Sequence, residues 1–178
     1  MVVTVVLRVL QLVFAAVVLA LSVVLINEHG TGKSPTQLPY GAFCGGLGLF
    51  VGAIGLAAVF FDKLQGIIMA AVDALATLFV LAGGITYAVS ARVGSCSNAR
   101  YIANSNYRVK PIFSTGLKPE YFDKDQNLRQ GRLGDDLWSR CLMVQVETAF
   151  LWFLFACLAA TAVLGLMTRS KSRGASFV

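Results

Sequence analysis

Four long stretches of this sequence are almost free of charge, and they limit what the chain can fold into. The stretches are 18 to 24 residues long and together hold one charged residue: Val9–Ile26, Tyr40–Phe61, Gly66–Val89 and Thr148–Met167. A helix needs about 20 apolar residues to cross about 30 Å of hydrocarbon. Because lipid offers the backbone no hydrogen-bond partners, such stretches cross it as helices. The sequence therefore predicts an all-α integral membrane protein, an antiparallel bundle of four transmembrane helices.

The predicted organisation is one transmembrane domain over residues 1–168, with a long loop inside it at 92–140 and a basic tail at 169–178. The expected spans cover about 5–26, 40–61, 66–90 and 141–167. Only 13% of the residues are charged, against about 25% in soluble domains. The composition excludes a soluble enzyme, and the net charge of +6 needs no nucleic acid to explain it.

The first apolar stretch has an alternative interpretation as a cleaved signal peptide. Its only basic residue, Arg8, lies inside the stretch rather than ahead of it, and the stretch is longer than a typical signal core. We expect a retained span.

The orientation of the bundle is left open by the residues themselves. Four spans place both termini on one side with five basic residues, whereas the opposite side carries ten, nine of them in the 92–140 loop. The positive-inside rule then favours a cytoplasmic loop. Cys96 and Cys141 favour the opposite, because they flank the loop at adjacent helix ends and a disulfide between them needs an oxidising compartment. Two free thiols remain the alternative.

Glycines recur at spacings of four and three residues along the second span. They are Gly41, Gly45, Gly48, Gly52 and Gly55, and they form one continuous helix face. Small residues let membrane helices approach closely. The face is predicted to pack inside one molecule, and the alternative is a groove for self-association or lipid.

Asp73 is the most informative single residue within the apolar stretches, because a carboxylate within hydrocarbon is costly and usually faces a partner. Arg8 and Gln11 of the first span reach a similar depth, so an Arg8–Asp73 pair that includes Gln11 is predicted. A protonated Asp73 bonded to Thr77 or to backbone is the alternative.

Glu147 lies about one and a half turns into the fourth span, near the other membrane face. Its carboxyl is expected to snorkel or to bond arginine or tyrosine side chains of the loop. Asp73 and Glu147 together support a second functional hypothesis, a small channel or transporter subunit.

No pattern of catalytic or metal-binding residues stands out. His29 is the single histidine, and Gly30–Ser34 lacks the spacer of a phosphate-binding loop. We therefore expect no enzyme, metal or cofactor, although a bound membrane lipid or sterol is compatible with the sequence. In the tail, Arg169, Lys171 and Arg173 are predicted to attract anionic lipid headgroups.

Three stretches resemble the fungal MARVEL-domain tetraspans of the non-classical export protein family, which is associated with eisosomes. They are Leu7-Arg8 with Gln11, Ser95-Cys96-Ser97-Asn98 with Tyr101, and Arg140-Cys141 with Gln145 and Ala149-Phe150-Leu151-Trp152-Phe153. Asp73 also falls where the family tends to have an acidic residue. Two features differ from the family pattern: the loop between the cysteines is longer, and Glu147 replaces a small apolar residue.

The resemblance implies a plasma-membrane protein with cytoplasmic termini and a disulfide-bonded loop outside. It implies a non-enzymatic organiser of membrane microdomains, responsive to sphingolipid or sterol and linked to eisosomes or unconventional export. The expected partners are membrane lipids, further copies of the chain or other membrane-organising proteins, and no nucleic acid.

Overall fold

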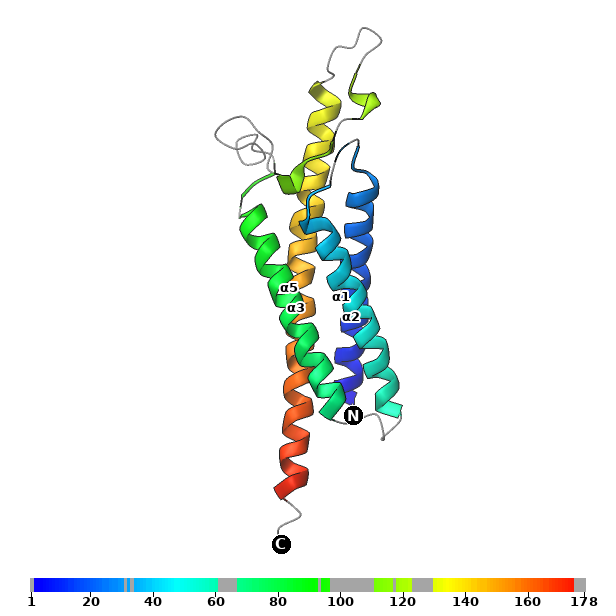
Figure 1. Cartoon of the computed structure of the whole chain (residues 1–178), viewed down its shortest axis with the longest axis vertical. Helices are drawn as coiled ribbons and strands as arrows, with labels where there is room; N and C mark the ends of the chain where they lie inside the picture. Colours follow the sequence, from blue (N-terminus) through cyan, green and yellow to red (C-terminus); the bar gives the residue numbers. More distant parts are fainter. Residues whose placement is uncertain are drawn as a thin grey trace.

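The computed structural model of the chain describes residues 2–30, 32, 34–60, 67–92, 94–96, 111–116, 118–122 and 130–174. Four long helices dominate this part of the chain (Figure 1). They are α1 (Val2–Asn27), α2 (Gln37–Phe60), α3 (Ile67–Ala91) and α5 (Gln130–Gly174). Two short 3₁₀ helices, η2 (Pro111–Phe113) and η3 (Pro119–Tyr121), lie between α3 and α5 in the sequence.

The four helices form a bundle in which each helix has two close neighbours. Helix α1 packs against α2 and α5, and α3 packs against the same two helices. The order around the bundle is therefore α1, α2, α3, α5, so that α1 and α3 face each other across its centre. Helix α1 begins and α5 ends at the same end of the bundle, as four antiparallel spans require (Figure 1).

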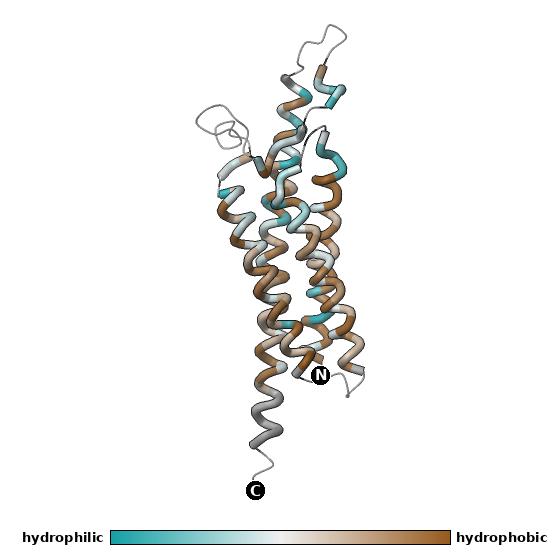
Figure 2. The backbone as a smooth tube through the Cα atoms, viewed as in Figure 1, coloured by the Kyte–Doolittle hydropathy of each residue, from teal (hydrophilic) through white to brown (hydrophobic). Residues whose placement is uncertain are grey.

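All four helices are long and apolar enough to cross a membrane. Their outward side chains are apolar: the large exposed residues include Val6 and Val13 on α1, Phe50 on α2, Leu78 on α3 and Phe153 on α5. Figure 2 shows the bundle as predominantly hydrophobic along its length. The predicted fold class, a four-helix membrane bundle, is confirmed.

Helix α5 is longer than the sequence indicates. It begins at Gln130, so residues 130–140, which the sequence predicts as loop, are helical. Leu133 and Leu137 are one turn apart, and Leu137 packs against the core of the bundle, which explains why the helix starts early. With 45 residues, α5 is about 68 Å long and extends past the other helices at both ends (Figure 1).

The glycine face of α2 is filled by α1 within the same molecule. A Cβ atom on Gly45 would lie 2.6 Å from the backbone nitrogen of Leu19, and one on Gly48 would lie 3.0 Å from the Cβ atom of Ala15. By contrast, a Cβ atom on Gly46, which lies outside this face, would meet nothing within 4 Å. The geometry agrees with packing inside the monomer and leaves no groove there for a second copy or a lipid.

Candidate functional site

Arg8 of α1 and Asp73 of α3 meet in the bundle interior as a two-pronged ion pair. Arg8 Nη1 donates to Asp73 Oδ1 at 2.8 Å, and Nη2 donates to Oδ2 at 2.5 Å. The two residues are 4% and 2% exposed. Both carboxylate oxygens are thus held by one guanidinium, the strong geometry for such pairs.

Helix α2 supplies the space and a further hydrogen bond for this pair. Arg8 Nη1 also donates to Gln11 Oε1 at 3.1 Å, and Gln11 Nε2 donates to the Gly48 carbonyl at 3.2 Å. A Cβ atom on Gly55 would lie 2.6 Å from Arg8 Nη1, so the guanidinium passes where only glycine fits. We call Arg8, Gln11, Gly55 and Asp73 the Arg8 cluster.

Thr77 does not take the role that the alternative interpretation gave it. Its hydroxyl donates to the backbone carbonyl of Asp73 at 2.6 Å, while the Asp73 carboxylate is bonded to Arg8. The geometry thus has the predicted Arg8–Asp73 contact, and it joins the two helices that face each other across the bundle.

A second polar cluster brings together residues from all four helices. Tyr87 of α3 donates its hydroxyl to Glu147 Oε1 of α5 at 2.9 Å, and Ser22 of α1 donates to the same oxygen. A Cβ atom on Gly41 of α2 would lie 2.5 Å from Glu147 Oε1 and 2.7 Å from Ser22 Oγ. We call Ser22, Gly41, Tyr87 and Glu147 the Glu147 cluster.

The expectation that Glu147 snorkels or bonds loop side chains is wrong. Its side chain is 0% exposed, and its partners lie on α1 and α3. The reason is that Gly41 leaves a space at the bundle centre that the carboxyl fills. Sequence reasoning missed Ser22, Tyr87 and Gly41 as its neighbours, although Ser22 is one of two polar residues in the first apolar stretch.

The two clusters are separated by the same number of residues on every helix. Arg8 and Ser22 are 14 residues apart on α1, as are Gly41 and Gly55 on α2 and Asp73 and Tyr87 on α3. On α5, 14 residues beyond Glu147, lies the buried Thr161. At 1.5 Å per residue, the levels are about 21 Å apart, so the clusters lie towards opposite faces of a hydrocarbon layer about 30 Å thick.

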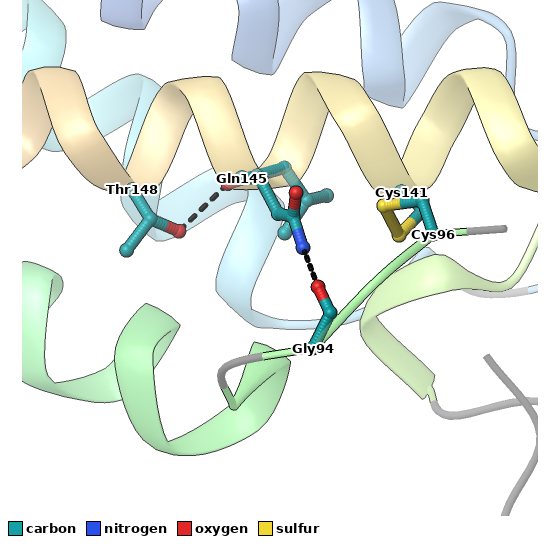
Figure 3. Close-up of a disulfide and its surroundings, with 6 residues drawn as sticks. Gly94, Cys96, Cys141, Gln145 and Thr148 are labelled. Atoms are coloured by element: carbon teal, nitrogen blue, oxygen red, sulfur yellow. Dashed lines mark hydrogen bonds between the residues drawn. A yellow bond between two sulfur atoms is a disulfide. The ribbon is translucent and has the colours of Figure 1, made fainter. Parts of the chain in front are cut away.

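The loop end of the bundle is closed by a disulfide between Cys96 and Cys141, whose Cα atoms are 5.8 Å apart. Figure 3 shows this bridge at the start of the apolar part of α5. One turn further along, Gln145 Nε2 donates to the Gly94 carbonyl at 2.8 Å. The cysteine pairing that the sequence left open is therefore present, whereas Ser97, Asn98 and Tyr101 lie outside the described residues.

Arg140 links the end of α1 to the loop, a role that the sequence did not predict. Its side chain is 0% exposed, and its guanidinium donates to the Leu25 carbonyl at 2.8 Å and to the Ser114 carbonyl at 3.0 Å. The arginine thus satisfies a backbone acceptor at the C-terminal end of α1, where carbonyls lack helical partners. It also holds the segment 111–116 over the bundle.

Above the bundle, residues of η3 and of the first turns of α5 line an open pocket of about 320 Å³. At its wall, Lys118 Nζ donates to Asp136 Oδ2 at 3.0 Å, and Tyr121 donates to the same oxygen. Burial, together with the Asp136 carboxylate that accepts its hydroxyl, raises the pKa of Tyr121. These contacts order the part of the loop nearest to α5.

Comparison with known proteins decides the family. The MARVEL family, described as a membrane-associating domain, matches residues 2–164. The chain belongs to this family. This MARVEL protein is also 26% identical to the non-classical export protein 2 homolog of Schizosaccharomyces pombe over 158 residues, which cover 88% of the chain and 72% of that protein. No solved structure matches it significantly. The resemblance found in the sequence is confirmed.

Two other expectations concern ligands. Among the described residues, no group of three histidine, cysteine or acidic side chains could hold a metal ion. The predicted headgroup contacts of Arg169, Lys171 and Arg173 involve side chains outside the described part of the chain, although α5 continues through these positions.

Proposed function

We propose that this MARVEL protein is a non-enzymatic organiser of plasma-membrane microdomains. It acts through lateral contacts of its helix faces with lipids and with other copies or membrane-organising proteins. The observation that carries the proposal is the division of the bundle into two surfaces. Polar groups of the spans are bonded to one another in the interior, and large apolar side chains face outward on every span.

Aromatic side chains give the outward surface fixed features. Phe43 of α2 and Phe79 of α3 stack edge to face with ring centroids 5.8 Å apart, and both are about half exposed. On the other side of the bundle, the rings of Phe14 on α1 and Phe153 on α5 pack with their centroids 5.6 Å apart. These rigid aromatic side chains form an apolar surface of fixed shape, which suits selective contact with ordered lipids such as sphingolipids and sterols. This is the lipid response we propose.

The disulfide supports cytoplasmic termini and an external loop, despite the excess of basic residues in that loop. A disulfide persists in an oxidising compartment and is rare in the cytosol, and Cys96 and Cys141 lie at the loop end of the bundle. Plasma-membrane residence and a link to eisosomes or unconventional export remain proposals that rest on the family and on the printed name of the fission yeast relative.

The rival function is a small channel or transporter subunit that uses Asp73 and Glu147. The ion pair speaks against it, because both Asp73 oxygens are occupied by Arg8. The two carboxyls also lie at levels about 21 Å apart, and buried apolar residues occupy intermediate positions: Val18 between Arg8 and Ser22 on α1, and Val80 between Asp73 and Tyr87 on α3.

One pair of assays separates the two functions. The full chain carrying a fluorescent protein is expressed in fission yeast, and its distribution in the plasma membrane is recorded before and after sterol extraction. In parallel, the purified protein is reconstituted into vesicles of phosphatidylcholine and sterol, and ion flux is measured.

We expect sterol-dependent patches in cells and no flux above that of empty vesicles. A uniform distribution that is insensitive to sterol would contradict the organiser. Flux that Asp73→Asn abolishes, and that the loop variant Glu120→Gln leaves unchanged, would establish the channel instead.

A further inference from the structure

The Glu147 carboxyl uses only one of its two oxygens. Oε1 accepts hydrogen bonds from Ser22 and Tyr87, whereas Oε2 has no partner among the described residues. The group is fully buried. An ionised carboxylate at such a place is costly unless a cation or several donors compensate its charge.

The helices around Glu147 present neutral groups to it. Helix α1 contributes the Ser22 hydroxyl, and α3 contributes the Tyr87 hydroxyl. Helix α2 contributes Gly41 and, one turn along, the buried thiol of Cys44, whose hydrogen points to the Phe79 carbonyl. Within the described part of the chain, none of these neighbours supplies a positive charge.

On α5 itself, the nearest cation in sequence is Arg140, seven residues before Glu147 and about 10 Å away along the helix. Its two terminal nitrogens are bonded to the carbonyls of Leu25 and Ser114. The guanidinium is therefore committed to the loop end of the bundle, and Glu147 differs in this respect from Asp73, which Arg8 neutralises directly.

Among the described residues, Glu147 belongs to no group of three histidine, cysteine or acidic side chains that could hold a metal ion. On the side of α2 the Gly41 backbone packs closely against it, since a Cβ atom on Gly41 would lie 2.5 Å from Glu147 Oε1 and 2.7 Å from Ser22 Oγ. A proton needs no such set of ligands and removes the charge completely.

We infer that Glu147 is a proton-binding site that locks the loop-side halves of the four helices together. The proton sits on Oε2, and the neutral acid accepts hydrogen bonds from α1 and α3 through Oε1. When the O–H bond breaks, the proton passes to water on the loop side and an uncompensated negative charge stays in the bundle. The charge weakens the packing of α5 against its neighbours. This inference does not depend on the proposed organiser function.

The sign of the resulting pH dependence follows from linkage. The folded bundle holds the Glu147 proton, whereas a carboxyl exposed by unfolding releases it readily, so the folded state binds more protons. Stability therefore falls as pH rises.

The test measures thermal unfolding of the full chain in phosphatidylcholine nanodiscs from about pH 5 to about pH 9. We expect the wild-type Tm to fall by about 3 °C per pH unit over part of this range, and Glu147→Gln, a neutral isostere, to remove this fall. Asp136→Asn, which removes an acid outside the bundle, should keep it.

An identical pH slope in the wild type and in Glu147→Gln would overturn the inference. So would a Tm that depends on whether sodium or potassium is present at fixed pH, because a metal ion would then be the bound cation.

A second measurement needs no variant. Dicyclohexylcarbodiimide is an apolar reagent that adds to protonated carboxyl groups, and mass spectrometry locates the adduct. We expect Glu147 to be labelled, with labelling lost as pH rises, and Asp73 to stay unlabelled in its ion pair. Labelling of Asp73 in preference to Glu147 would contradict the proton-binding site.

Discussion

The Arg8 cluster and the Glu147 cluster each hold a buried carboxyl, at two levels of the same bundle about 21 Å apart, yet the carboxyls are bonded differently. Asp73 has both oxygens bonded to one guanidinium. Glu147 has one oxygen bonded to two neutral hydroxyls and the other without a partner among the described residues. A closed ion pair fixes which helices face each other, whereas a carboxyl without a counter-ion leaves a site that can respond to its surroundings.

Removal of one member of the ion pair should have the largest effect. Asp73→Ala leaves the buried Arg8 charge without a counter-ion, and we expect a loss of about 3–5 kcal/mol in the free energy of unfolding. The measurement is SDS-induced unfolding of the protein in mixed micelles. Glu147→Gln is the comparison, since it leaves no unpaired charge. A loss of similar size in both variants would break the distinction between the clusters.

Removal of the disulfide tests the covalent bridge at the end of the bundle where the Glu147 cluster lies. The bridge joins residues 45 positions apart, and its loss by Cys96→Ser with Cys141→Ser should cost about 2–4 kcal/mol. Alkylation and non-reducing electrophoresis of intact cells check that the wild-type bridge exists. The free-cysteine variant Cys157→Ser is the control, and reduced thiols in the wild type would contradict both the bridge and the orientation.

Gly41 allows the Glu147 cluster to be disturbed without changing a charge. Gly41→Ala places a methyl group among three side-chain oxygens, and we expect a loss of about 1–3 kcal/mol. Gly46→Ala is the matched control on the same helix, because a Cβ atom there meets nothing within 4 Å. Equal unfolding curves for the two variants would show that the cluster is loosely packed.

Tyr87→Phe should have the smallest effect. It removes one neutral hydrogen bond to Glu147 and retains the ring, so we expect a loss of about 1 kcal/mol in the free energy of unfolding. A loss as large as that of Asp73→Ala would mean that the tyrosine, rather than packing, holds the cluster together.

Much of the fold could be predicted because membrane spans are marked by the absence of charge over a length that the bilayer sets. The early start of α5 could not, because residues 130–140 have a loop-like composition and their helix depends on the packing of Leu137 against the core. The apolar stretches thus define the membrane spans well, but the sequence indicates poorly where a helix continues beyond the membrane.

The two clusters differ in how far sequence reasoning reaches. Arg8 and Asp73 stand out as opposite charges at equal depth in apolar helices, so their contact could be predicted. Ser22, Gly41 and Tyr87 are ordinary residues in membrane helices, and their meeting with Glu147 depends on the order of helices around the bundle. The role of Arg140 could not be predicted for a related reason. Its partners are backbone carbonyls, which every residue type carries.

The most direct test of the central claim, that Arg8 and Asp73 neutralise each other in the bundle interior, is a double-mutant cycle on Arg8→Ala and Asp73→Ala. The free energies of unfolding of the wild type, both single variants and the double variant are compared in the same mixed micelles. The ion pair predicts that the double variant loses much less stability than the sum of the two single losses. Strictly additive losses would contradict it.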